Sequence, residues 1–139
     1  MRPRGTHRYF FYGTLIDADV RSAVLGNAAV NLPVYEDTLP GWRRVLMAGK
    51  TYPVIVRSPA HEVSGVRVAI AGSQARQRLT YFEGPEYHIE RVTLASGAQA
   101  DVFTGSQQAR PGTRSWDFDA WQKGDKARFL ARIRSQGHA

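Results

Sequence analysis

The sequence contains no cysteine, and this absence excludes several kinds of chemistry. Without thiols the chain can form no disulfide, use no thiolate nucleophile and offer no sulfur ligand to zinc. Long hydrophobic runs are also absent, because the apolar run at residues 9–12 is far too short to span a bilayer or to form the core of a signal peptide. We therefore expect neither a sulfur-dependent site nor a membrane partner, and we predict a cytoplasmic location.

Internal repeats, low-complexity segments and linkers are missing as well. A chain of 139 residues is long enough to bury one core, and 42% hydrophobic with 22% charged residues is an ordinary globular composition. We therefore predict a single domain over residues 1–139, with its core at about residues 8–134.

Acidic residues are outnumbered, which leaves a formal net charge of +7. The cations gather towards the two ends of the chain: Arg2, Arg4 and Arg8 in the first segment, and Lys123, Lys126, Arg128, Arg132 and Arg134 in the last. A basic balance can indicate nucleic acid, but no helix-turn-helix, aromatic RNA-binding strand or zinc finger is present. The cations of the last segment fit the solvated face of a helix, so we disfavour a nucleic-acid partner. The same positive electrostatic field would equally attract a small anionic ligand.

Three familiar motifs are incomplete. Residues 49–51 resemble the end of a phosphate-binding loop, but Arg44 replaces the glycine that should open it. Residues 61–62 begin a zinc-binding pattern whose second histidine is missing, since Gly65 stands in its place. No Gly-x-Ser-x-Gly elbow occurs. We therefore expect no metal and no cofactor, and carboxylates remain as the catalytic candidates.

The apolar pattern predicts many short strands. Residues 9–12 are consecutively apolar, as in a strand covered on both faces, and residues 63–71 contain a clear alternation. Further strands are expected where apolar segments are bounded by Pro, Gly or Ser: residues 42–48, 53–57, 86–95 and 100–104, the last two joined by a hairpin at residues 96–97.

Fewer helices are expected. Asp17 is placed to cap a helix over residues 18–25, and Ser73 to cap one over residues 74–83 that ends at a Gly-Pro pair. A final helix is predicted over residues 117–133, with an inner side formed by Phe118, Trp121, Phe129 and Ile133 and with Gly124 as a weak point. The chain is thus predicted to be an α+β domain whose mostly antiparallel or mixed strands curl toward a barrel.

Glu83 is a candidate acid or base because of its place on the second helix. Ala75, Leu79 and Phe82 form the apolar stripe, and Glu83 falls about 70° from the centre of that stripe. It is also at the C-terminal end, where the helix dipole disfavours an anion. Partial burial and the dipole would both raise its pKa and suit it to general base chemistry near neutrality. The alternative is that Glu83 turns into solvent, and periodicity does not decide between the two.

The turn after the first strand is a second candidate. Gly13 and Thr14 interrupt the aromatic run just before the helix that Asp17 caps. Such a turn exposes backbone N–H groups that can hold a carboxylate, and a glycine allows a ligand to approach the backbone closely. Gly13 can equally well supply only the turn between a strand and a helix. A single glycine leaves both interpretations open.

These segments together resemble a known family. Tyr12-Gly13-Thr14-Leu15 after an aromatic strand is similar to the Tyr-Gly-Thr-Leu loop of the gamma-glutamylcyclotransferase-like family, which includes gamma-glutamylamine cyclotransferases and avirulence-induced-gene-like proteins. Further segments agree in consistent order over roughly residues 8–130: Gly-Trp-Arg-Arg at 41–44, Tyr-Pro at 52–53, Val-Ser-Gly at 63–65, the Glu-Gly segment at 78–84, Tyr87 and the strand at 92–94.

The resemblance implies a small mixed β-barrel with flanking helices and a cavity between the loop and the glutamate. By resemblance, Tyr12, Gly13, Thr14 and Leu15 would bind a γ-glutamyl substrate, and Glu83 would be the general acid/base. Deprotonated by Glu83, the α-amine of the substrate would attack its own γ-carbonyl and release 5-oxoproline without a cofactor. Tyr87 would hydrogen-bond the substrate or orient Glu83, unless it is only a half-buried strand aromatic.

The sequence also departs from the family pattern. Thr80 stands where an aspartate is usual, and Ile89 stands where arginine is frequent, with Arg91 nearby. These changes put the leaving group of the substrate in doubt. A non-catalytic module that binds a γ-glutamyl or amino-acid-like ligand is the alternative function, and whether the chain is a monomer or a homodimer is left open.

Overall fold

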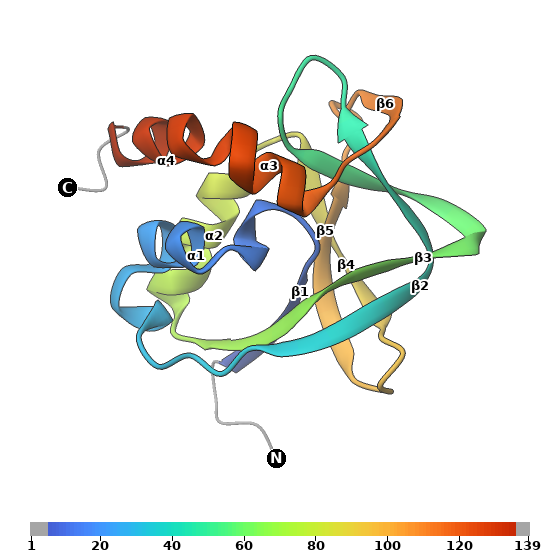
Figure 1. Ribbon diagram of the computed structural model, residues 1–139. Helices are drawn as coiled ribbons and strands as arrows, with labels where there is room; N and C mark the ends of the chain where they lie inside the picture. Colours follow the sequence, from blue (N-terminus) through green and yellow to red (C-terminus); the bar gives the residue numbers. More distant parts are fainter. Residues whose placement is uncertain (1–5, 136–139) are drawn as a thin grey trace.

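A curved six-stranded sheet forms one side of the molecule (Figure 1). The computed structural model describes residues 6–135, so Arg2 and Arg4 lie outside the described residues. The strands are β1 (Thr6–Phe11), β2 (Tyr35–Met47), β3 (Pro53–Ala71), β4 (Tyr87–Thr93), β5 (Gln99–Gly105) and β6 (Pro111–Ser115). Their order in the sheet is β4-β5-β1-β3-β2-β6, with β1 and β5 parallel and the other neighbours antiparallel. The α+β class is confirmed, but the sheet is not closed, so it is a barrel only in a loose sense.

The helices lie together against one face of the sheet (Figure 1). They are η1 (Thr14–Ile16), α1 (Ala18–Leu25), η2 (Gly26–Ala29), α2 (Ser73–Glu83), α3 (Phe118–Gly124) and α4 (Lys126–Ser135). No helix in the described part of the chain is long and apolar enough to cross a membrane.

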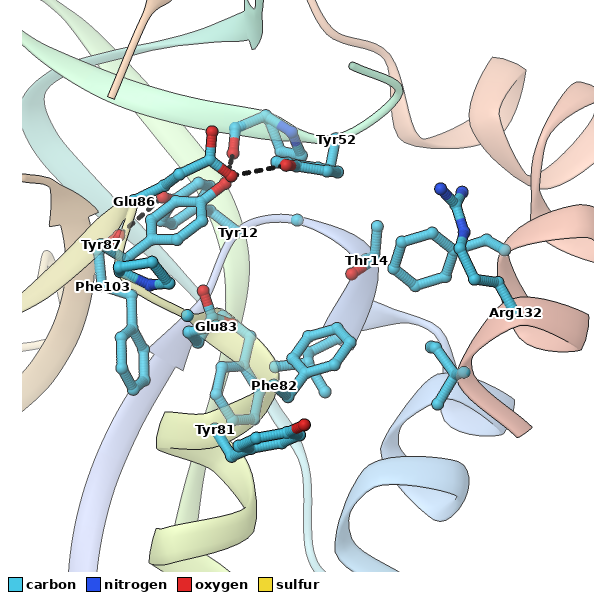
Figure 2. A pocket seen from close by; sticks show the side chains of 18 of the residues that line it. Tyr12, Thr14, Tyr52, Tyr81, Phe82, Glu83, Glu86, Tyr87, Phe103 and Arg132 are labelled. Carbon is cyan, nitrogen blue, oxygen red and sulfur yellow. Dashed lines mark hydrogen bonds between the residues drawn. The ribbon is translucent and has the colours of Figure 1, made fainter. Parts of the chain in front are cut away.

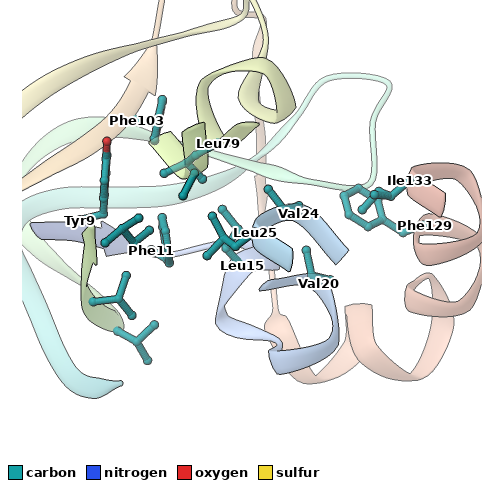
Figure 3. Packing of buried hydrophobic residues seen from close by; sticks show 14 of the residues in the cluster. Tyr9, Phe11, Leu15, Val20, Val24, Leu25, Leu79, Phe103, Phe129 and Ile133 are labelled. Carbon is teal, nitrogen blue, oxygen red and sulfur yellow. The ribbon is translucent and has the colours of Figure 1, made fainter. Parts of the chain in front are cut away.

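The main core fills the space between the sheet and the helices (Figure 3). Tyr9 and Phe11 of β1 point into it, whereas Phe10 joins a second cluster on the other face of the sheet. All three are at most 3% exposed, so β1 is covered on both faces, as its consecutive apolar residues predict. This double cover holds the end of β1, where the turn at residues 12–15 begins, in a fixed place.

Two predicted helix ends are confirmed and one cap is wrong. The Asp17 carboxylate accepts hydrogen bonds from the backbone N–H groups of Asp19 and Val20, at 2.9 and 3.1 Å, and so caps α1. Gly84 ends α2 with a φ of 76°, in the region that glycine favours. Ser73 does not cap α2, because the helix begins at Ser73 itself and Gly72 occupies the N-cap position without a side chain to bond.

The strand prediction fails between residues 57 and 63, where two expected strands are one continuous β3. The two strands were predicted as separate segments bounded by Pro, Gly or Ser, and Pro59, which cannot donate to a ladder, lies between them. In the structure the β2–β3 register passes from the pair Pro40 and Glu62 to the pair Trp42 and Arg57. The segment that holds Pro59 has no partner in β2, so the missing N–H costs nothing there.

Strand β6 was also missed, and the predicted final helix breaks at Gly124, the position named as its weak point. β6 has no large apolar residue and is mostly exposed at the edge of the sheet, so it carries no hydrophobic signal. The helix expected over residues 117–133 is two helices, which meet at Asp125 directly after Gly124. The inner side is nevertheless as expected, since Trp121, Phe129 and Ile133 are buried.

Candidate active site

A pocket of about 330 Å³ opens where the end of β1, the end of α2 and the side of α4 meet (Figure 2). The predicted site residues all line it: Tyr12, Gly13, Thr14, Leu15, Glu83 and Tyr87. The first four come from the turn after β1, Glu83 from the end of α2 and Tyr87 from the start of β4. The structure therefore brings together two segments that are about 70 residues apart in the sequence.

The turn at residues 12–15 is held tightly at its start. The Tyr12 hydroxyl donates a hydrogen bond to the Phe103 carbonyl at 2.6 Å, and the Arg44 guanidinium donates to the Tyr12 carbonyl at 2.9 Å. Thr14 begins the short helix η1, and the first N–H groups of a helical turn have no partner within that turn. Ile16 and Asp17 donate to the carbonyls of Gly13 and Thr14, which leaves the N–H groups at the start of the turn as candidates for binding an anion on the pocket side.

A glycine is needed at residue 13 because a side chain would clash with its neighbour, and not because the backbone has a positive φ. Its φ is −122°, but a Cβ atom at this position would lie 2.9 Å from Cγ of Pro53. The ring of Pro53 itself lines the pocket. The turn can therefore pack against the start of β3 only because residue 13 has no side chain.

Glu83 is the last residue of α2, and its side chain points into the pocket (Figure 2). The turn into solvent that helical periodicity left open does not occur. Burial raises the pKa of Glu83 from 4.5 to about 8, and no charge or hydrogen bond from residues 6–135 offsets this rise. The residue remains partly exposed through the pocket, so a ligand can reach the carboxyl. A carboxyl with this pKa can both accept and donate a proton near neutral pH.

Tyr87 is half-buried and its hydroxyl donates to the Pro53 carbonyl at 2.7 Å. Burial raises its pKa, so the phenol stays protonated. The hydroxyl therefore holds the start of β3 in place and does not donate to Glu83. Its oxygen can still accept a hydrogen bond from a ligand in the pocket.

The pocket also contains polar residues that were not predicted as site residues, among them Tyr52, Glu86 and Arg132. Tyr52 donates to Oε1 of Glu86 at 2.6 Å across the pocket wall, and Arg132 reaches the pocket from α4 (Figure 2). Tyr52 could have been found from the Tyr-Pro element of the family resemblance. Nothing in the sequence marked Glu86, because its position is typical of the start of a strand. Nothing marked Arg132 either, because it fits the solvated face of a helix.

The departures from the family pattern lie outside the pocket. Thr80 is exposed on α2, and Ile89 is 45% exposed on β4. Arg91 is 3.5 Å from the Asp101 carboxylate, measured from Nε to Oδ1. None of the three lines the pocket. Among residues 6–135 no three His, Asp or Glu side chains come together as metal ligands.

Comparison with known proteins identifies the family. The family model described as "Gamma-glutamyl cyclotransferase, AIG2-like" matches residues 9–123, which is most of the chain. The chain belongs to this family. AIG2-like protein A of Arabidopsis thaliana is 30% identical over 132 residues, which cover 89% of this chain and 77% of that protein. AIG2-like protein D of the same plant is 26% identical, with 89% and 84% covered.

Solved structures agree on the fold. A solution structure of an Arabidopsis thaliana protein matches with a TM-score of 0.67 at 26% identity, covering 95% of this chain and 91% of that one. A solved gamma-glutamyl cyclotransferase matches with a TM-score of 0.63 at 15% identity, covering 93% and 86%. At that identity the second match shows the fold alone. The family model includes the turn at residues 12–15 and Glu83 but ends before α4.

Proposed function

We propose that this chain is an enzyme that cleaves a γ-glutamyl amide by intramolecular cyclisation, with Glu83 as its general acid and base. The observation that carries the proposal is the Glu83 carboxyl, with a pKa of about 8, in the same pocket as the amide-rich turn at residues 12–15. Membership of the family supports the reaction class. The pocket volume of about 330 Å³ is at the small end of the usual range for ligand sites and suits a small substrate.

The proposed substrate pose follows from charge. The α-carboxylate of the γ-glutamyl group binds the free N–H groups at the start of η1 (Thr14–Ile16), where the backbone favours an anion. The α-ammonium group then lies near Glu83, and the oxygen of the Tyr87 hydroxyl can accept one of its hydrogen bonds. This pose folds the glutamyl chain so that its own amine faces its γ-carbonyl.

The reaction needs one group that moves protons. Glu83 accepts a proton from the α-ammonium, and the free amine attacks the γ-carbonyl carbon to close a five-membered ring. The bond from that carbon to the leaving nitrogen breaks as Glu83 donates its proton to that nitrogen. The ring nitrogen then gives its remaining extra proton to the Glu83 carboxylate, which passes it to the departing amine, so that the amine leaves as an ammonium ion. The products are 5-oxoproline and a free amine, and no water is consumed. Attack within one molecule gains much of its rate from orientation, so neither a metal nor a cofactor enters this scheme.

The pKa of Glu83 fits both halves of this cycle. A carboxyl with a pKa of about 8 is mostly protonated at pH 7 and can protonate a leaving amine. The positive charge of a bound α-ammonium favours the ionised carboxyl, so binding of the substrate lowers the pKa of Glu83 and prepares it to act as the base.

A substrate panel tests the proposal. Wild-type protein is incubated with γ-glutamyl amines and γ-glutamyl dipeptides, and 5-oxoproline is measured by mass spectrometry. We expect release from at least one substrate, and we expect Glu83→Gln to lower turnover by roughly 10²-fold or more with an unchanged circular dichroism spectrum. Glu62→Gln is the matched control, because Glu62 is exposed on β3 and does not line the pocket.

Two results would contradict the proposal. One is that every substrate of the panel stays intact while the protein is folded, in which case the chain is a binding module of the same fold. The other is that Glu83→Gln keeps full turnover, in which case another group moves the protons.

A further inference from the structure

Arg132 is the one cationic side chain among residues 6–135 that lines the pocket. It lies on α4, the helix that forms the third wall, and it is exposed to solvent (Figure 2). Its guanidinium carbon lies 5.9 Å from the centre of the Phe129 ring, and that ring lines the same pocket. Arg132 therefore stands at the pocket mouth and not on the far side of the helix.

Two other cations of α4, Lys126 and Arg128, have carboxylate partners, whereas the guanidinium of Arg132 has none within the described residues. Arg128 is 2.9 Å from the Asp125 carboxylate, and Lys126 is 2.8 Å from the carboxylates of both Asp17 and Asp19. The Ser135 hydroxyl donates to the backbone carbonyl of Arg132, but within residues 6–135 the Arg132 guanidinium makes no hydrogen bond or ion pair. An unpaired guanidinium at the mouth of a pocket is suited to a carboxylate ligand, which it can bind in a bidentate manner.

The charge of Arg132 also reaches the pocket interior. Burial raises the pKa of Tyr52 on another wall, and the positive charge of Arg132 acts against that rise. Glu86 accepts a hydrogen bond from Tyr52 and forms no ion pair with Arg132. The Arg132 guanidinium is therefore available to an anion that enters the pocket.

We propose that Arg132 determines specificity by binding a carboxylate on the leaving amine, so that the protein favours substrates whose leaving group carries that charge. The inference rests on the proposed function. In the proposed pose the α-carboxylate is held at the turn of residues 12–15, and the glutamyl chain is folded beside Glu83. The leaving group is the part of the substrate that extends toward the mouth, where Arg132 is exposed.

A cycle of two substrates and two proteins tests this proposal. The substrates are γ-glutamyl-alanine and γ-glutamyl-alaninamide, which differ by the charge of one terminal group. The proteins are the wild type and Arg132→Gln, with Arg134→Gln as the matched control, because Arg134 is an exposed arginine of the same helix that does not line the pocket. The measured quantity is kcat/KM for 5-oxoproline release, and the intrinsic difference in reactivity between the two substrates cancels within the cycle.

We expect Arg132→Gln to lower kcat/KM for γ-glutamyl-alanine about fivefold more than for γ-glutamyl-alaninamide, as for a solvent-exposed charge pair at the strong end of its range. The extra loss should fall mainly on KM and should shrink at high salt. Arg134→Gln should show no such difference. Equal losses for both substrates would place Arg132 on the α-carboxylate, and no loss for either would leave it without a role, so both results overturn the inference.

A binding measurement keeps this test independent of turnover. Calorimetry with the Glu83→Gln protein compares the two ligands without their being consumed. Tighter binding of γ-glutamyl-alanine than of the alaninamide, lost in the Glu83→Gln, Arg132→Gln double variant, supports the inference even if no 5-oxoproline is released by the wild type. Indistinguishable binding overturns the inference while leaving the proposed reaction to its own assay.

Discussion

The raised pKa of Glu83 must make the stability of the fold depend on pH in an unusual direction. In the unfolded chain the carboxyl ionises near pH 4.5, whereas in the folded protein it ionises near pH 8. Between these values the folded state holds one more proton than the unfolded state. Unfolding then releases a proton, so the free energy of unfolding falls as the pH rises from about 4.5 to about 8.

The size of this effect can be bounded. One pKa unit corresponds to about 1.4 kcal/mol, so the change from 4.5 to about 8 gives an upper limit of about 4 kcal/mol between pH 5 and pH 8.5. Glu83 is partly exposed through the pocket, and solvent at the carboxyl screens the penalty. We therefore expect roughly 2 kcal/mol.

Urea unfolding of the wild type and of Glu83→Gln at pH 5 and pH 8.5 measures this quantity. Glutamine does not ionise, so the variant should gain about 2 kcal/mol relative to the wild type on going from pH 5 to pH 8.5. The difference between the two proteins removes the contribution of every other group, including Asp17, Asp37 and Glu90, whose pKa values are lowered and whose stabilisation is lost only as the solution becomes acidic. Glu62→Gln should run parallel to the wild type. Parallel curves for Glu83→Gln as well would refute the reasoning, because Glu83 would then be solvated as in the unfolded chain.

Two further predictions concern the frame of the site. Gly13→Ala places a Cβ atom 2.9 Å from Cγ of Pro53 and should lower the free energy of unfolding in urea by roughly 1–3 kcal/mol. Gly124→Ala, whose Cβ would have no atom within 4 Å, should leave the free energy of unfolding unchanged or raise it slightly. Equal effects of the two substitutions would contradict the steric explanation. Asp17→Ala removes the cap of α1 and also the buried one of the two carboxylates that pair with Lys126, since Asp17 is only 3% exposed. It should lower the free energy of unfolding by about 2 kcal/mol. A loss below about 0.5 kcal/mol would mean that the cap contributes little.

Local signals in the sequence predicted the frame of the site well. The aromatic run of β1, the Asp17 cap and the glycine that ends α2 each depend on a few neighbouring residues, so each could be read from the chain. The failures involve partners that are distant in sequence. Pro59 is tolerated because of a register shift opposite Gly41 in β2, and β6 exists only because β2 offers it an edge.

The same distinction applies to the pocket. Helical spacing put Glu83 at the margin of the α2 stripe but could not say whether it turned inward, because that depends on what lies beside the end of the helix. The family resemblance supplied this missing neighbour in the turn at residues 12–15. It supplied nothing for Arg132, whose helix lies beyond the residues that the family model matches.

This placement of α4 separates two properties of the pocket along the chain. The groups proposed to move protons and hold the glutamyl part lie within residues 9–123, whereas Arg132, proposed to meet the leaving group, lies within residues 126–135. On this proposal, exchanging α4 between relatives should alter which leaving groups are accepted without altering the groups that break the bond. We therefore expect the accepted leaving group to vary with the residues of α4 while the proposed reaction is kept.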